Sequence, residues 1–418
     1  MEWSPHGQCY NRPYTFPKIT KKIDFISSKS LSVTQSIEVD VGPPHGRQPH
    51  VFGELIIKPT EDPNAQSSGQ LDVEVISNDE SLEAQFTYDD GAQKYTVTVP
   101  GSVDWRVSNL SPCIQIRITV WAPPEAVLDM LDVQLVHLDV DIRDGVQLDA
   151  ALGAAIRSAS GKVNAPTHPH EFRSRNIEIT TVSGDVQGWY PLYDLLRVRS
   201  ESGTIKVDIG HKTASSDHPQ PAILHLTTVS GDVTATGTDM GDSIPARDYM
   251  TTISTVSGTV KAKVPFSSIG KFDTKSADFD LDLTPVLDQG GRPGKPKLTT
   301  KTVSGTTKVV LRSPLWVNLA ATSSSEEQQH VMDVSRTLAN LHSDHSSMSG
   351  DIKLRYPSAW EGMFYADSMS GSQTFRGDGV HVDRKHGWVN KVVEGHKGSG
   401  KSELKVHSIS GSEDFLVE

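Results

Sequence analysis

The chain has 418 residues and a formal net charge of −12. This charge argues against a nucleic-acid binder, which clusters lysine and arginine against phosphates, and against docking on an anionic membrane. No run of about 18 apolar residues occurs, so we expect no transmembrane segment. The first residues lack a basic segment followed by an apolar core, so we expect no signal peptide in this chain.

Two different sections precede the centre of the chain. Residues 1–20 hold three prolines among several aromatic residues, which predicts an extended N-terminal arm. Residues 21–128 contain segments, such as 71–75 and 114–120, in which apolar and polar residues alternate and β-branched residues are frequent. This alternation is typical of β-strands, so we expect a β-rich N-terminal section there.

A short motif, Thr-Thr-Val-Ser-Gly-Asp-Val at residues 180–186, recurs to the end of the chain. Near copies occupy residues 227–233, 254–260, 301–307 and 346–352, and looser copies occupy 158–163, 199–205, 367–373 and 407–413. Self-similarity of this kind is the signature of a repeat architecture. The glycines at the centre of the units are Gly161, Gly184, Gly203, Gly231, Gly258, Gly305, Gly350, Gly371 and Gly411.

A further unit carries Ala277 where the glycine is expected. The two widest intervals between glycines predict more degenerate units, one near residues 323–325 and one near Gly387. Insertions rich in glycine, proline, serine and aspartate separate some units, and we expect them to be surface loops. They occupy residues 211–220, 238–248, 289–297 and 323–345.

Positions inside each unit are counted from the glycine, which is position 0. Position −1 is serine, and position −3 is serine or threonine, in every unit identified above. Apolar residues favour odd positions before the glycine (−7, −5) and even positions after it (+2, +4). Because side chains alternate between the two faces of a strand, this change of parity requires a bend at the glycine if both arms are to face one core. Each unit is therefore predicted to be a strand, a glycine corner and a second strand.

One such unit cannot bury its apolar face, whereas stacked units can. We therefore predict an all-β protein in which residues 129–418 form a right-handed parallel β-solenoid of about ten units. The hydroxyls at −3 and −1 are expected to form two ladders on the inner side of the corner. On this basis the substitution Ser257→Leu is expected to destabilise the fold strongly.

The repeated Thr-Val-Ser-Gly-Asp-Val unit behind an alternating strand resembles the putative-adhesin β-helix family of unknown function, found in bacterial and fungal surface proteins. The resemblance covers roughly residues 129–418. It implies a non-enzymatic, adhesin-like or scaffold protein at the cell surface or outside the cell, with cell-wall glycans or other surface proteins as partners. It supplies no catalytic, cofactor-binding or metal-binding residues.

The alternative function is that of a carbohydrate-active β-helix enzyme, a polysaccharide lyase or hydrolase. Such enzymes need converging carboxylates, and Asp185, Asp232 and Asp351 each follow a corner glycine. However, aspartate after glycine is ordinary turn chemistry, and threonine fills the same position in other units. An enzyme is expected to bring three or more acidic or basic side chains together in one groove, and a scaffold is not.

Residues 395–402, Gly-His-Lys-Gly-Ser-Gly-Lys-Ser, match the pattern of a phosphate-binding P-loop. A P-loop needs a helix after it, whose N-terminal amides meet the phosphates. The residues that follow alternate like the strand of the last repeat unit. We therefore expect a loop between coils and no nucleotide.

Three smaller features have two interpretations each. The aromatic clusters at residues 189–193 and 356–360 would either bind a partner or cap a coil, and capping is favoured. His342 and His345 would be either a metal pair or solvated loop residues, and solvated residues are favoured. Cys9 and Cys113 can form one disulfide at most, and the sequence leaves open whether they pair.

Overall fold

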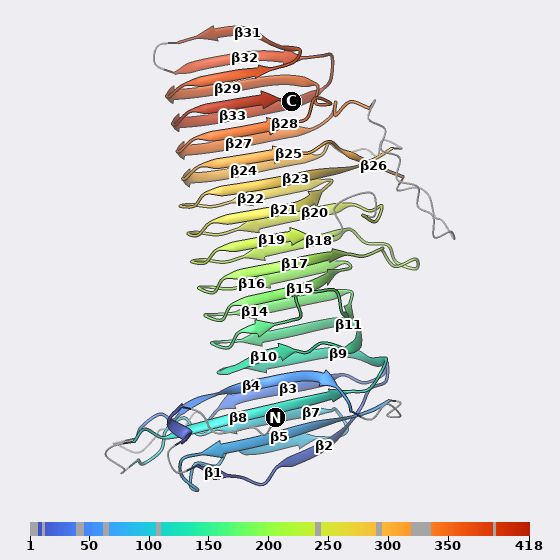
Figure 1. The fold of residues 1–418 in the computed structure, drawn as a ribbon, viewed down its shortest axis with the longest axis vertical. Helices are drawn as coiled ribbons and strands as arrows, with labels where there is room; N and C mark the ends of the chain where they lie inside the picture. Colours follow the sequence, from blue (N-terminus) through green and yellow to red (C-terminus); the bar gives the residue numbers. More distant parts are fainter. Residues whose placement is uncertain are drawn as a thin grey trace. The chain divides into compact units, whose positions relative to one another are not determined.

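The computed structural model describes residues 7–10, 13–38, 46–61, 67–105, 110–238, 244–289, 295–318, 336–387 and 390–418. Apart from one short 3-10 helix, η1 (Gly7–Tyr10), the regular elements in these ranges are all β-strands (Figure 1). The chain divides into two compact units, Met1–Tyr190 and Pro191–Glu418. The domain limits expected from the sequence, with a solenoid domain beginning at residue 129, stay a prediction.

The first unit contains fifteen strands among its described residues, the last of which runs across the boundary. They are β1 (Tyr14–Thr15), β2 (Ile19–Asp24), β3 (Leu31–Ile37), β4 (His50–Pro59), β5 (Ser68–Ser77), β6 (Gln85–Asp89), β7 (Lys94–Val99), β8 (Cys113–Ala122), β9 (Ala126–Leu135), β10 (Leu138–Ile142), β11 (Gln147–Ser158), β12 (Val163–Asn164), β13 (Glu171–Ser174), β14 (Asn176–Thr181) and β15 (Val186–Leu192).

Parallel pairing in the first unit begins well before the glycine repeats. Strand β4 pairs in parallel with β8 and β10, and β10 continues to β12 and then β15. On the other side, β3 pairs in parallel with β7 and β9, and β9 continues to β11, β13 and β14. Antiparallel strands accompany them: β5 pairs with β1, β2 and β8, and β6 with β7. The segment expected as an extended arm thus contributes β1 and the start of β2 to a sheet.

The second unit contains nineteen strands among its described residues. They are β16 (Leu195–Arg199), β17 (Ile205–His211), β18 (Ala222–Thr227), β19 (Val233–Gly237), β20 (Tyr249–Ser254), β21 (Val260–Phe266), β22 (Ile269–Asp273), β23 (Phe279–Asp288), β24 (Lys297–Ser304), β25 (Thr307–Leu311), β26 (Leu315–Val317), β27 (His342–Ser349), β28 (Ile352–Tyr356), β29 (Gly362–Ser370), β30 (Gln373–Gly377), β31 (Val380–His386), β32 (Lys391–Lys397), β33 (Ser402–Ser410) and β34 (Glu413–Val417).

Two parallel sheets run through the second unit, one made of the strands before each corner and one of the strands after it. The first sheet has the order β16-β18-β20-β22-β24-β27-β33-β29. The second has the order β17-β19-β21-β23-β25-β28-β34-β30. The predicted all-β, parallel β-solenoid fold is therefore confirmed.

The order of the coils departs from the order of the chain at the C-terminal end. The last coil of the sequence, β33–β34, lies between the coil β27–β28 and the coil β29–β30. The described residues of the interval before Gly411 therefore contain no degenerate coil near Gly387. Its residues form β31 and β32, which pair antiparallel with each other, and β32 also pairs antiparallel with β29. Strand β29 therefore pairs in parallel with β33 of the final coil and antiparallel with β32 of the hairpin.

The other degenerate units have different outcomes. Ala277 does occupy a corner, since Ser276 forms parallel bridges to Ser257 and Ser304 in the neighbouring coils. The unit expected near residues 323–325 lies outside the described residues, as does most of the insertion at 323–345.

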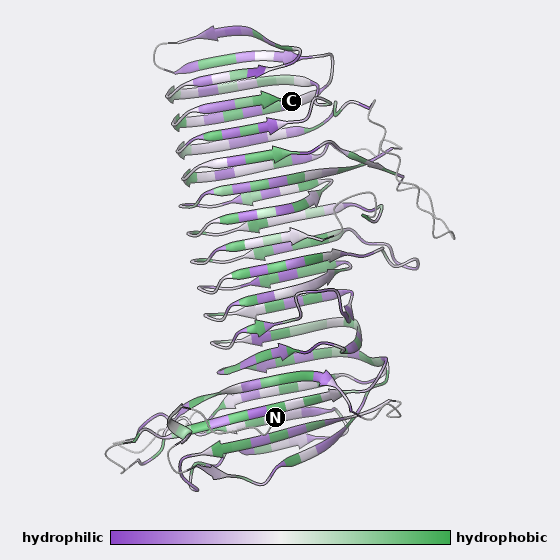
Figure 2. Cartoon of the chain, in the orientation of Figure 1, coloured by the Kyte–Doolittle hydropathy of each residue, from purple (hydrophilic) through white to green (hydrophobic). Residues whose placement is uncertain are grey.

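The core follows the predicted change of parity at the corner. Figure 2 shows hydrophobic and hydrophilic residues alternating along many strands. At position +2, Val233, Val260 and Ile352 are fully buried. At position −5, Val198, Leu226 and the corresponding residues of other coils are buried as well. Both arms of a coil therefore contribute aliphatic side chains to one interior.

Candidate interaction surface

The corner glycines stack directly on the backbone of the neighbouring coil. A Cβ atom added to Gly258 would overlap the carbonyl oxygen of Gly231, and one added to Gly411 would overlap that of Gly350. Gly258 also has a φ of +129°, whereas the overlap occurs at other corners without a positive φ. Close approach of two backbones is therefore the requirement that the corners share.

Every corner glycine takes part in such a stack or supports one. In the first unit Gly161 lies on Leu138 and Gly184 on Gly161; in the second unit Gly231 lies on Gly203, Gly258 on Gly231, Gly305 on Ala277, Gly350 on Gly305, Gly411 on Gly350 and Gly371 on Gly411.

The hydroxyl at position −3 lies inside and fastens the corner. Ser158 and Ser200 are buried, and their Oγ atoms accept hydrogen bonds from the amides of Gly161 and Gly203 at 2.9 and 2.8 Å. In another coil the Thr302 Oγ1 donates to the Ser304 carbonyl at 3.1 Å. The predicted inner position of these hydroxyls agrees with their burial.

The serine at position −1 is not inside, so the predicted second inner ladder is wrong. Ser257 is exposed, and its amide donates to the carbonyl of Val229 in the neighbouring coil at 2.9 Å. The strand preceding this corner ends at Ser254, and the bend that follows turns the Ser257 side chain outward. Simple alternation, which assumes an extended chain up to the glycine, fails there.

Aspartate at position +1 joins neighbouring coils at several corners, a role that the sequence analysis missed. Asp232 Oδ1 accepts from the amide of Thr259 at 2.7 Å, and Asp351 Oδ1 accepts from that of Ser412 at 2.9 Å. Asp185 instead lies 3.8 Å from the Lys162 ammonium. The available signal was that aspartate recurs directly after a corner glycine, where a short acceptor reaches the next coil.

Position −2 places a column of apolar side chains on the outside of the second unit. We call Val229, Val256, Val303, Met348 and Met369 the apolar column; their side chains are 39–51% exposed. Lys275 interrupts the column between Val256 and Val303. An isolated exposed valine is ordinary, whereas a row of them in adjacent coils is a feature of interaction surfaces.

A groove of about 820 Å³ lies beside the apolar column, on the outer face of β22, β24 and β27. Its lining includes Val303 and Met348, and several charged side chains: Lys271, Asp273, Lys297, Lys301, Asp344 and His407. The groove thus combines an apolar end with a polar floor and rim.

The groove holds more than three charged side chains, a feature expected of the enzyme alternative. Its two aspartates differ in their surroundings. Asp273 forms an ion pair with Lys271 at 3.0 Å. Asp344 lies two strands away, and strand spacing puts the two Cα atoms about 12 Å apart. One carboxylate is therefore engaged by a neighbouring lysine, and the two aspartates are not adjacent on the sheet.

The aromatic cluster at residues 356–360 is buried, as the favoured capping interpretation predicts. Tyr356 and Trp360 are at most 1% exposed and contact Phe415 edge-on, with ring centroids 5.4 and 5.5 Å away. In the first unit Trp189 is buried too, and its ring lies 5.3 Å from that of His170. These rings are therefore not available to stack on a ligand.

His345 is a core residue, which corrects its expected place in a solvated loop. It lies in β27, fully buried, with Nδ1 2.8 Å from Thr300 Oγ1 and Nε2 2.8 Å from the Tyr356 hydroxyl. Burial lowers the pKa of His345 to about 3. His342 lies at the start of the same strand, 3.2 Å from Glu403. Among the residues that the structure describes, no group of three or more histidine, cysteine or acidic side chains is arranged around a metal position.

The P-loop-like segment, residues 395–402, connects two strands. It begins inside β32, turns at Gly398 with a φ of +62°, and ends at the start of β33. The Ser402 hydroxyl donates to the carbonyl of Leu338 at 2.9 Å and accepts from the amide of Leu341 at 2.9 Å. The segment therefore lacks the helix N-terminus that cradles phosphates in a P-loop.

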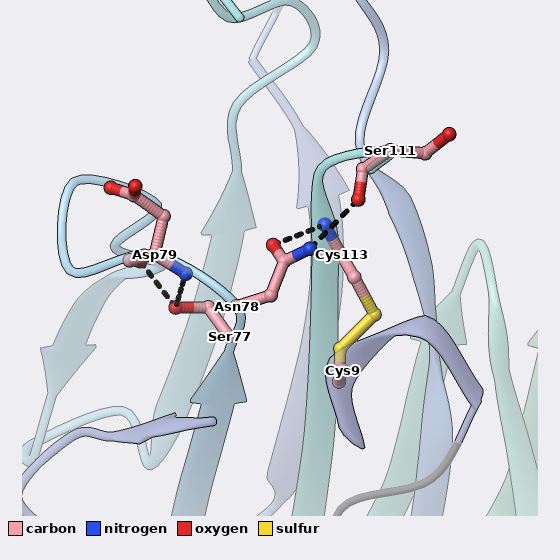
Figure 3. Close-up of a disulfide and its surroundings, with 6 residues drawn as sticks. All are labelled: Cys9, Ser77, Asn78, Asp79, Ser111 and Cys113. Atoms are coloured by element: carbon pink, nitrogen blue, oxygen red, sulfur yellow. Dashed lines mark hydrogen bonds between the residues drawn. A yellow bond between two sulfur atoms is a disulfide. The ribbon is translucent and has the colours of Figure 1, made fainter. Parts of the chain in front are cut away.

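A disulfide between Cys9 and Cys113 resolves the question that the sequence leaves open (Figure 3). It joins η1 to the start of β8 in the first unit. Beside it, the buried Asn78 accepts a bond from the Cys113 amide at 3.0 Å and donates to the Ser111 carbonyl at 2.8 Å. Both cysteines are fully buried. Their separation of 104 residues means that this bond closes a long loop.

No helix in the described part of the chain is long and apolar enough to cross a bilayer.

Solved structures of low similarity include three that are described as adhesion proteins. A "putative cell adhesion protein" from Clostridium sporogenes has 7% identity and a TM-score of 0.15, covering 96% of this chain and 99% of that one. "Putative adhesins" from Parabacteroides distasonis and Parabacteroides merdae have 9% and 10% identity and TM-scores of 0.23 and 0.18. They cover 94% and 81% of this chain, and 97% and 93% of their own. Because the TM-scores are this low, we draw no conclusion from the likeness to these structures.

No curated protein matches the sequence. The family described as Toastrack DUF4097 matches residues 60–311, which is more than half of the chain. The match spans β5 to β25 and the corners from Gly161 to Gly305. The chain therefore belongs to the Toastrack DUF4097 family.

Proposed function

We propose that this protein is a non-enzymatic, adhesin-like scaffold that binds a partner through the outer face of its second unit. The surface consists of the apolar column and the groove beside it. The observation that carries the proposal is the column itself, because its side chains remain exposed at position −2 of five coils while the core is filled by other positions, although Lys275 and the half-buried Ile409 stand between its members. Exposed apolar rows with a polar rim are typical of binding surfaces.

A protein partner fits this surface better than a glycan. Three strongly exposed methionines, Met348, Met363 and Met369, lie on β27 and β29 in this unit. Flexible thioether side chains are frequent at protein-binding surfaces, whereas sugar sites favour exposed aromatic rings. The large aromatic rings of residues 356–360 are buried instead. Paired charges such as Lys271 and Asp273 would then orient the partner.

A cell-surface or extracellular location is part of the proposal. The Cys9–Cys113 disulfide supports it, because disulfides form and persist mainly in oxidising compartments. This support is independent of the apolar column, since the two features lie in different units.

Adhesion of protein-coated beads to intact cells tests the proposal. The variant Val303→Ser/Met348→Ser/Met369→Ser removes three of the five column side chains, including the two that line the groove, and it is expected to abolish adhesion while keeping the fold. The control is Val382→Ser, which changes an equally exposed valine on β31. Protease treatment of the cells should abolish binding of the wild type, and glycosidase treatment should not. A glycan partner would reverse these two results. If binding of the wild type survived both treatments, a protein or glycan partner on the cell would be contradicted.

The enzyme alternative is favoured only by the charged side chains in the groove. Its test is release of reducing ends from acidic and neutral polysaccharides by the wild type and by Asp344→Asn. Cleavage by the wild type that is lost in the variant would contradict the scaffold proposal and support the enzymatic function.

A further inference from the structure

The inner apolar ladder of the second unit changes character at the outermost two coils. Position +2 of the other coils is held by Ile205, Val233, Val260, Phe279, Thr307 and Ile352. In the last two coils it is held by Glu413 on β34 and Gln373 on β30. Their exposed fractions are 1% and 7%, so a carboxyl and an amide lie in the core where most of the other coils have an apolar side chain.

Glu413 and Gln373 are register partners and share one hydrogen bond. Gln373 Nε2 donates to Glu413 Oε2 at 2.8 Å. The other two oxygens of the pair, Glu413 Oε1 and Gln373 Oε1, are both buried and have no hydrogen-bond partner among the described residues. Two acceptors left without a donor are costly in a core. One proton shared between these two oxygens would satisfy both, and would close a ring of two hydrogen bonds between acid and amide.

Among the described residues, no cationic side chain forms an ion pair with Glu413. On the β28 side the register partner of Glu413 is the apolar Ile352. From β33 the Ser408 hydroxyl contacts Glu413, and it donates to the Ser368 hydroxyl of β29 at 2.9 Å. Asp367 of β29 and His407 of β33 pair with each other outside the core at 2.8 Å.

The remaining charged groups near the pair come from the hairpin. Lys391 of β32 and Lys385 of β31 direct their ammonium groups to backbone carbonyls, those of Gly371 and Gln373. Within the described residues, Glu413 therefore has no ion-pair partner, and protonation is the available route to neutral charge.

We propose that Glu413 and Gln373 form a proton-operated latch, which fastens the outermost coil, β29–β30 with its hairpin β31–β32, to the rest of the second unit. The Glu413 carboxylate takes up one proton from solvent. The resulting O–H donates to Gln373 Oε1, and the existing bond from Gln373 Nε2 is kept. Loss of the proton leaves a buried charge and reopens the two acceptors, which loosens the coil.

The direction of the pH effect follows from burial. Desolvation raises the pKa of Glu413 to about 7, from an ordinary value of 4.5. A raised pKa in the folded state means that the latch contributes fully below pH 4.5 and that its contribution is lost as the pH rises through about 7. The outermost coil should therefore be most protected in mildly acidic solution and looser above neutral pH.

Hydrogen exchange of the full chain at pH 5.5 and pH 8, expressed as protection factors, tests the latch. In the wild type, amides of β29, β30 and β32 should lose protection at pH 8, while those of β18 and β20 keep it. Each pH unit between 4.5 and about 7 should lower the protection about tenfold, so the loss from pH 5.5 to pH 8 should be on the order of thirtyfold. In Glu413→Gln an amide replaces the acid and can still donate to Gln373, so protection should be high at both pH values.

Two further variants and one direct titration complete the test. The exchange Glu413→Gln/Gln373→Glu moves the acid to the neighbouring coil and should restore the pH dependence. Glu394→Gln, a change on β32, should leave the wild-type behaviour. The ¹³C resonance of the Glu413 carboxyl should titrate near pH 7 in the wild type. Titration near 4.5, or a Glu413→Gln variant that keeps the wild-type pH dependence, would overturn the proposal.

Discussion

The two units hold parallel strands together in different ways. The first unit has glycine corners at Gly161 and Gly184, but it adds connections that occur once: a disulfide across 104 residues, antiparallel strands such as β5, and side-chain contacts such as that of Asn78. The second unit repeats one local arrangement, in which a buried hydroxyl at −3 precedes a glycine stacked on the next backbone. A single lesion should therefore have a large effect where it cuts a unique link, and a graded effect where it removes one of many equivalent links.

The largest effect is expected from the unique link. In Cys9→Ser/Cys113→Ser, loss of a long loop closure should lower the unfolding free energy of the first unit by about 4 kcal/mol. Denaturant titration that follows the two units separately measures it. The second unit should be unaffected, and an unchanged first unit would show that the disulfide is not what closes it.

A smaller effect is expected at a corner. Gly258→Ala places a Cβ against the Gly231 carbonyl and at an unfavourable φ, which should cost about 3 kcal/mol in the second unit. The control is Gly153→Ala, because the nearest atom to its added Cβ, Asn176 O, is 3.6 Å away. Equal melting temperatures for these two variants would show that the close approach of the two backbones does not require glycine at the corner.

Acid should weaken the second unit through a buried histidine. The pKa of His345 is lowered in the folded state, so its contribution is complete above pH 6.5 and is lost as the pH falls toward about 3. Each pH unit below 6.5 costs about 1.4 kcal/mol for this group. The difference in unfolding free energy between pH 7 and pH 5.5 should therefore be smaller for His345→Gln than for the wild type. An equal difference in the two proteins would contradict the burial of His345.

The smallest effect is expected for Ser257→Leu. Its side chain is exposed on the bend, so the unfolding free energy should change by no more than about 0.5 kcal/mol. Thermal melting measures it. A strong loss of stability would restore the inward position that alternation alone predicts.

The sequence was sufficient for features that repeat locally. The glycine corners, the buried hydroxyl at −3 and the apolar residues at +2 all follow from a pattern that recurs in most coils. Ser257 was misplaced because periodicity describes strands and not the bend itself. The Asp232 contact to Thr259 was missed, although both residues occupy position +1 of consecutive units, because aspartate after glycine was interpreted as turn chemistry within one unit.

Long-range order was harder to predict. Nothing local in residues 402–417 shows that β33–β34 enters between two earlier coils, because each coil carries nearly the same motif. His345 appeared to lie in a polar loop because serine and aspartate surround it, although its own alternating position faces the core. The groove of the candidate surface likewise depends on which strands become neighbours.

The order of the stacked coils is the central claim, and cysteine cross-linking tests it most directly. Met348 and Ile409 lie between the register pairs Ser347–Ser408 and Ser349–Ser410. The pair Met348→Cys/Ile409→Cys should therefore form a disulfide readily under mild oxidation, whereas Met348→Cys/Met369→Cys, two strands apart, should not. Efficient cross-linking of the second pair and none of the first would contradict the inserted final coil and the surface built on it.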